Sequence, residues 1–161
     1  MEGGCDLVCF SDASYAFVNE MSRSITGYLF KIAGGPISWK SYRQHSVASS
    51  TMEAEYMALS DASRELVWLR NLYGDCTGRA ITSPTVIYED NEACIHITKN
   101  PSISDKSKHI QVRYHVVRSH YESGELTLKH IGTDKQQADI FTKVLAPPQF
   151  SAAVSMLGIK D

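Results

Sequence analysis

VASSTMEAEYMAL, residues 47–59, contains the start of the longest helix that the sequence predicts. Ser50 and Glu53 have the spacing of a capping box, in which Ser50 caps the first turn and Glu53 reaches back to the Ser50 amide. Small and apolar residues then recur at helical spacing as far as about Tyr73: Ala54, Ala58, Ala62, Leu66 and Leu69. The stretch therefore predicts a long helix with one face packed against the rest of the protein.

Two acidic residues of this stretch, Glu53 and Glu55, are rivals for one functional role. On a helix with about 3.6 residues per turn their side chains point about 200° apart, so one site cannot use both. Helix capping already accounts for Glu53. Glu55 has no such explanation and lies near the packed stripe, so we take Glu55 as the candidate site residue.

Strands and helices alternate on both sides of this helix. Three strands are predicted before it, at residues 7–11, 24–33 and 36–39, with a turn at Gly34-Gly35. After it we expect a strand at 85–89, helices at 91–99 and 109–121, a strand at 125–130, and a helix that starts at a second capping box (Thr133 and Gln136) and runs through Phe141. This order predicts an α/β fold with a mixed sheet and helical crossovers, in a single domain spanning residues 1–161.

The composition is that of a globular protein with a sizeable core: 161 residues, 43% hydrophobic and 21% charged. No apolar run approaches the roughly 20 residues of a membrane helix, and the first residues lack the basic and apolar regions of a signal peptide. The four cysteines form no CxxC pair, which favours reduced, packed thiols in an intracellular protein: Cys5, Cys9, Cys76 and Cys94. We therefore expect no membrane partner.

The net charge is only −2, but the charges are unevenly distributed. Between Lys99 and His120, only Asp105 opposes a series of basic residues: Lys99, Lys106, Lys108, Arg113 and Arg118. A locally positive segment, in a chain with acidic residues elsewhere, suits a polyanion held by bases on one side and by metal on the other.

Four acidic residues lie at the edges of predicted elements, in the order strand, helix, strand, helix: Asp12, Glu55, Asp90 and Asp139. Each of the three aspartates has a purely structural alternative, as a turn residue, a helix cap or a solvated helix residue. Together they predict a divalent-cation site, because carboxylates beside apolar runs are rarely buried unless paired or metal-bound. Three nearby acids are better explained as surface or cap charges: Glu89, Glu92 and Asp134.

Seven blocks span nearly the whole chain: FSDA (10–13), RSITGY (23–28), ISWKS (37–41), VASSTMEAEYMAL (47–59), YEDNEA (88–93), KHIQVRYH (108–115) and QADIFTK (137–143). In these blocks, and in their order, the chain resembles the ribonuclease H domain of copia-type LTR retrotransposon polyproteins. The resemblance implies a ribonuclease H-like fold, a five-stranded mixed sheet flanked by helices. When residues 55–59 are matched to the corresponding helix of the family, the resemblance also selects Glu55 rather than Glu53 as the site residue. Ser14, Tyr15 and Phe17 depart from the family pattern, which puts the local loop shape in question.

The family resemblance also implies an activity. Asp12, Glu55, Asp90 and Asp139 would hold two Mg²⁺ ions, with Mn²⁺ as a substitute, and the RNA strand of an RNA–DNA hybrid would be cut to 5′-phosphate and 3′-hydroxyl ends. By the same resemblance, His130 would assist turnover as a fifth catalytic residue. A strand-end histidine without a role is the alternative.

The expected partners are an RNA–DNA hybrid and the reverse transcriptase domain of the same polyprotein, in a cytoplasmic retrotransposon particle or in the nucleus. Candidate substrate contacts are the basic residues of two segments, although each one taken alone is better explained as solvated surface: Lys40, Arg43, Lys106, Lys108, His109 and Arg113. The spacing of His109, His115 and His120 does not favour a zinc site. The remaining alternatives are a catalytically silent nucleic-acid-binding domain, an integrase-like nuclease acting on DNA, and a structural interaction module.

Overall fold

The computed structural model describes residues 6–15, 23–100 and 108–159, without the side chains of 108–111. Its centre is a five-stranded sheet in the order β3-β2-β1-β4-β5. The strands are β1 Val8–Ser14, β2 Ile25–Ile32, β3 Gly35–Arg43, β4 Thr85–Glu89 and β5 Leu126–His130. β1 pairs antiparallel with β2 and parallel with β4, which confirms the predicted five-stranded mixed sheet.

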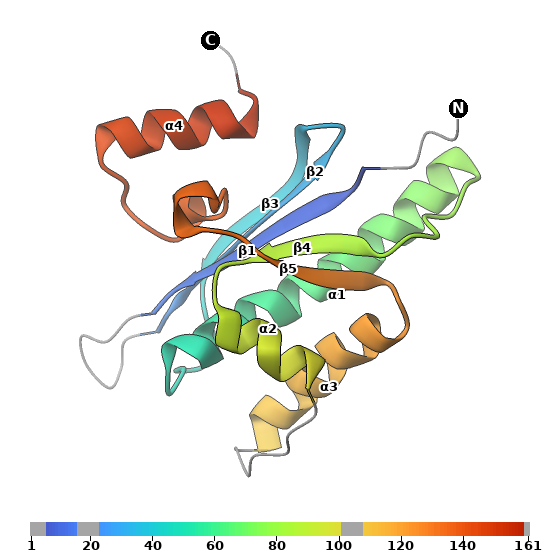
Figure 1. Cartoon of the computed structure of the whole chain (residues 1–161), viewed down its shortest axis with the longest axis horizontal. Coiled ribbons are helices and arrows are strands. Elements are labelled where there is room, and N and C mark those ends of the chain that lie inside the picture. Colours follow the sequence, from blue (N-terminus) through green and yellow to red (C-terminus); the bar gives the residue numbers. More distant parts are fainter. Residues whose placement is uncertain (1–5, 16–22, 101–107, 160–161) are drawn as a thin grey trace.

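Helices cover both faces of the sheet (Figure 1). One face carries the helices α1 (Thr51–Thr77), α2 (Glu92–Lys99) and α3 (Lys108–Glu122). The opposite face carries the 3-10 turns η1 (Thr133–Lys135) and η2 (Asp139–Phe141), followed by the helix α4 (Pro147–Leu157). None of the helices in the described ranges is long and apolar enough to cross a membrane.

Side-chain alternation along β1 separates the two layers. Cys9 belongs to the main core, which includes Tyr56, Leu59 and Leu66 of α1. Phe10 points to the other face and packs with Leu29, Ala138 and Leu157. Asp12 shares the face of Phe10, two residues further along the strand. The strand therefore directs Asp12 toward the segment that carries η2.

The start of α1 confirms the helix predicted from residues 47–59, with one change in the capping box. Ser50 Oγ accepts a hydrogen bond from the Glu53 backbone N–H at 3.2 Å, as expected of an N-cap. Glu53 does not reach the Ser50 amide. Its Oε2 accepts instead from the backbone N–H of Ser49 at 2.7 Å and from the Ser49 hydroxyl. Glu53 is thus a structural acid, which leaves Glu55 free for the site.

Two predicted helix starts are wrong. Asn91, not Asp90, caps α2, because the Asn91 side chain accepts a hydrogen bond from the Cys94 N–H at 3.0 Å. The second capping box opens no α-helix, and short 3-10 turns replace it. The reason is that Gln136 is buried and donates from Nε2 to the Ser11 carbonyl at 2.8 Å, so that it ties this segment to β1 instead of capping a helix.

Several boundaries also differ from the prediction. β1 continues to Ser14, so Asp12 lies within the strand. β3 continues to Arg43, which places Lys40 and Arg43 on an edge strand rather than on a loop. The turn before β3 is formed by Ala33 and Gly34, both with positive φ. Cys9 and Cys94 are buried as expected, whereas Cys76 is exposed.

Gly27 of β2 allows the η2 segment to approach the sheet beside Asp12, its partner in the strand register. A Cβ at Gly27 would lie 2.6 Å from Thr142 Cγ2 and 3.1 Å from the Ala138 carbonyl oxygen. Gly27→Ala should therefore lower the free energy of unfolding by about 1–3 kcal/mol, as overpacking does. The measurement is urea denaturation of the variant and of the unsubstituted protein.

Gly74 offers a matched control for that substitution. It lies within α1, and a Cβ there would meet nothing within 4 Å. Gly74→Ala should leave stability unchanged or raise it by up to about 1 kcal/mol, because alanine is the better helix former. Equal effects of the two substitutions would contradict a close approach at Gly27.

Candidate active site

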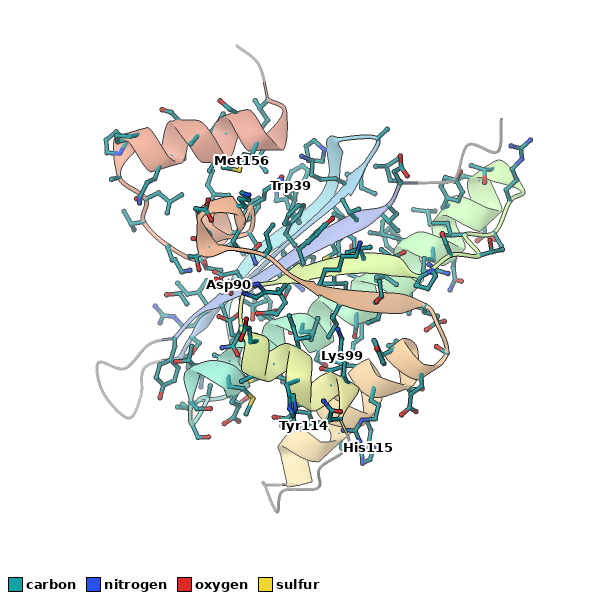
Figure 2. All side chains as sticks on the ribbon, viewed as in Figure 1. Trp39, Asp90, Lys99, Tyr114, His115 and Met156 are labelled. Atoms are coloured by element: carbon teal, nitrogen blue, oxygen red, sulfur yellow. The ribbon has the colours of Figure 1, made fainter. Side chains whose placement is uncertain are left out.

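The fold brings the four predicted carboxylates to one edge of the sheet. β1 and β4 are parallel, so their carboxyl ends meet at this edge and present Asp12 and Asp90 side by side. α1 supplies Glu55, and η2 supplies Asp139. Figure 2 shows Asp90 where β4 gives way to α2. Carboxylate oxygens of Asp12, Asp90 and Asp139 all lie within 4.8 Å of one another.

A second group of carboxylates adjoins the first and shares Asp90 with it. Oxygens of Glu55, Glu89 and Asp90 also lie within 4.8 Å of one another. Glu55 is 4% exposed and Glu89 is 0% exposed, whereas Asp90 is only partly buried. The expectation that Glu89 is a surface or cap charge is therefore wrong. The side chains of Thr85, Ile87 and Glu89 alternate inward along β4, a period-two signal that could have placed Glu89 inside.

Three residues that sequence reasoning did not assign to the site hold its carboxylates in place. Thr142 Oγ1 donates a hydrogen bond to Asp12 Oδ2, and Thr133 Oγ1 donates to Asp90 Oδ2 at 3.1 Å. Lys143 Nζ lies 3.3 Å from Asp12 Oδ1 and 2.8 Å from Asp139 Oδ1. Thr142 and Lys143 fall within the block QADIFTK, but their spacing alone gave no sign that they would reach Asp12 on a distant strand.

Burial, together with the crowding of like charges, raises the pKa values of the buried acids. Burial raises the pKa of Asp12, although the Thr142 hydrogen bond and the Lys143 charge act in the opposite direction. Burial, followed by the Asp12 and Asp90 charges, raises the pKa of Glu55 to about 9. Burial and the Glu55 charge also raise the pKa of Glu89. Two like charges about 5 Å apart cost roughly 3 kcal/mol at an effective dielectric constant of about 20, so this cluster favours added positive charge.

The donor set fits divalent magnesium or manganese. All its ligand atoms are carboxylate oxygens, which hard cations prefer, and neither group contains a cysteine or histidine. Glu55 Oε2 is buried and has no hydrogen-bond partner within the described part of the chain. A buried carboxylate oxygen without a partner is costly, and a bound cation would satisfy it.

The structure describes His130 and three of the six predicted substrate-binding residues in full: Lys40, Arg43 and Arg113. His130 is exposed, and its Nε2 lies 3.2 Å from the Asp90 carbonyl oxygen. Lys40 and Arg43 are exposed on β3, and Lys40 Nζ lies 4.8 Å from the centre of the Tyr42 ring. Arg113 on α3 is partly buried. Lys106 and the side chains of Lys108 and His109 lie outside the described residues, so all these assignments stay predictions.

Lys143 occupies the position of a built-in counterion for Asp12 and Asp139. Lys143→Met should lower the stability of the metal-free protein by about 2 kcal/mol, less than loss of a fully buried partner, because the Lys143 side chain is 35% exposed. The same change should tighten Mg²⁺ binding several-fold, since no ammonium group then has to leave the carboxylates. Calorimetric titration measures the affinity, and Lys129→Met, at an exposed position of β5, is the control.

Comparisons with known proteins agree with this geometry. No protein-family model matches the chain. The chain is 35% identical over 153 residues, 95% of its length, to the "Retrovirus-related Pol polyprotein from transposon RE1" of Arabidopsis thaliana. It is also 35% identical over 159 residues, 98% of its length, to the corresponding polyprotein from transposon TNT 1-94 of Nicotiana tabacum. It spans only 10% and 12% of the lengths of these two curated relatives.

Among solved structures, LC11-RNase H1 in complex with RNA/DNA hybrid superposes with a TM-score of 0.63 and 16% sequence identity, over 84% of this chain and 93% of that one. The chain is a ribonuclease H-fold homologue of transposon Pol polyproteins. The resemblance drawn from the seven sequence blocks is thereby confirmed. This ribonuclease H fold places the four carboxylates on separate elements around the carboxyl ends of β1 and β4.

Proposed function

We propose that the chain is a metal-dependent endoribonuclease that hydrolyses the RNA strand of RNA–DNA hybrids during retrotransposon reverse transcription. One observation carries the proposal: carboxylates from four separate segments converge at one edge of the sheet, with a buried oxygen that has no hydrogen-bond partner among the described residues. Pol polyprotein homology supports the retrotransposon context. The fold neighbour crystallised with an RNA/DNA hybrid supports the choice of substrate.

In this proposal the carboxylates of Asp12, Glu55, Asp90 and Asp139 hold two Mg²⁺ ions. When bound, two such metal ions would activate a water molecule and stabilise the leaving 3′ oxygen of an in-line displacement. The chain's own residues position the ligands: Thr142 orients Asp12, and Thr133 orients Asp90. His130 is exposed, and we propose that it assists turnover by carrying a proton at the edge of the site.

In this proposal, basic residues outside the carboxylate cluster bind the substrate. Lys40 and Arg43 on exposed β3 and Arg113 on α3 are the described candidates, and we propose Lys106, Lys108 and His109 as further contacts. A hybrid is recognised through its shape, its phosphates and the 2′-hydroxyl groups of the RNA strand. The reverse transcriptase domain of the same polyprotein is the proposed partner, in a cytoplasmic particle or in the nucleus.

The test is digestion of a labelled RNA–DNA hybrid with and without Mg²⁺, with single-stranded RNA, duplex RNA and duplex DNA as controls. We expect cuts only in the hybrid, only with Mg²⁺, leaving 5′-phosphate and 3′-hydroxyl ends. Hybrid binding without Mg²⁺-dependent cuts would favour a catalytically silent binding domain. Cleavage of duplex DNA would favour an integrase-like nuclease instead.

A further inference from the structure

Glu89 is a buried acid that the four-carboxylate arrangement does not use. We propose that Glu89 is a fifth carboxylate of the metal centre and forms one cation-binding position together with Glu55 and Asp90. The inference rests on the metal centre of the proposed function and deepens it. It assigns a ligand role to Glu89, whose side chain points into the protein with the other inward-facing residues of β4.

The position of Glu89 is set by the strand and by the backbone that follows it. Glu89 is the last residue of β4, and its side chain is 0% exposed. One carboxylate oxygen, Oε1, accepts a hydrogen bond from the Asn91 backbone N–H at 3.2 Å. This contact fixes the carboxylate at the start of α2, directly beside Asp90. The side chain therefore has little freedom to turn away from the cluster.

The other oxygen of Glu89 has no hydrogen-bond partner among the residues that the structure describes. Glu89 Oε2 and Glu55 Oε2 are both buried without a hydrogen bond within the part of the chain that the structure describes. Native proteins pair nearly all such atoms, because an unsatisfied buried oxygen loses its hydration without compensation. Lys143 forms ion pairs with Asp12 and Asp139, and no ion pair to Glu55 or Glu89 occurs among the described residues.

A divalent cation between these two oxygens would satisfy both. Ligand oxygens of Glu55, Glu89 and Asp90 lie within 4.8 Å of one another, and those of Asp12, Asp90 and Asp139 form the neighbouring group. Asp90, labelled in Figure 2, belongs to both groups. The two groups therefore describe two adjacent cation positions that share one carboxylate, the arrangement that two-metal sites use.

The test is Mn²⁺ binding to the metal-free full chain, followed by calorimetry, with Glu89→Gln beside Glu92→Gln. Glu92 lies three residues further on, is exposed in the first turn of α2, and loses the same charge. We expect Glu89→Gln to weaken one of two Mn²⁺ binding events by at least about 10-fold, the smallest loss typical of groups that only support metal ligands. Glu92→Gln should stay within about twofold of the unsubstituted protein, as expected of a remote surface charge. Equal isotherms for the two variants would overturn the proposal, because a proton shared between Glu55 and Glu89 would then explain the buried pair.

Thermal unfolding of the metal-free variants tests whether a loss of Mn²⁺ binding is caused by a folding defect. Glu89→Gln should be at least as stable as the unsubstituted protein, since glutamine buries no ionisable group. If it unfolds, Glu89→Asp takes its place, because it keeps the charge but withdraws the oxygen, and unchanged Mn²⁺ affinity in that variant overturns the inference. Hybrid digestion run in parallel separates the two proposals. If Glu89→Gln weakens Mn²⁺ binding but the unsubstituted chain cleaves no hybrid, the proposed function is wrong, whereas the role of Glu89 as a metal ligand is retained.

Discussion

Replacing Asp12 by Asn is expected to abolish hybrid cleavage while making the metal-free protein more stable. Asp12 is 0% exposed and lies within β1, where its carboxylate faces Asp90 and Asp139. Asparagine has nearly the same volume but carries no charge for a cation. We expect activity to fall by more than about a hundredfold, beyond the loss seen for groups that only support metal ligands. Cleavage of labelled hybrid at saturating Mg²⁺ measures the effect.

The stability half of this prediction follows from the same burial. Because burial raises the pKa of Asp12, its ionised form is disfavoured in the folded state despite Thr142 and Lys143. Removing the charge should therefore raise the urea midpoint of the metal-free protein. Asp75→Asn, at the exposed far end of α1, is the matched control and should change neither property. Cleavage of the hybrid by Asp12→Asn at the rate of the unsubstituted protein would contradict the proposed function.

A second large effect concerns pH. The metal-free protein should lose stability as the pH rises from the ordinary Glu55 pKa of 4.5 toward about 9. Within this window the folded protein binds more protons at Glu55 than the unfolded chain does, so the free energy of unfolding falls as the pH rises. The raised pKa values of Asp12 and Glu89 act in the same direction. The slope approaches about 1.4 kcal/mol per pH unit for each proton by which the two states differ.

Mg²⁺ should remove this loss, since cations that bind only the folded state replace the protons and stabilise it. The experiment compares urea unfolding between pH 5 and about 9, in chelator and in excess Mg²⁺, with Na⁺ at matched ionic strength as the control for screening. A metal-free protein that gained stability with rising pH would contradict the crowding of buried carboxylates at this edge.

Local sequence was sufficient for the elements and for most of the site. The start of α1, the succession of the five strands along the chain and the choice of Glu55 over Glu53 all followed from short-range patterns, because capping and side-chain periodicity depend on neighbours within one or two turns. Asp12, Asp90 and Asp139 were identified because acids at element edges are conspicuous, and the family blocks supported them. These signals need no knowledge of what the chain contacts elsewhere.

Only the tertiary structure assigned the residues that serve the site through distant contacts. Thr142 and Lys143 reach Asp12 across 130 and 131 positions of sequence, and Gln136 bonds to Ser11 across 125. The same long-range bond turned a predicted helix into two short turns. Glu89 was taken for a surface charge because glutamate is usually solvated, yet the inward face of β4 buries it beside Glu55. Burial and charge pairing arise from packing between elements, so a pattern confined to one element predicts where an acid lies along the chain but not which groups surround it.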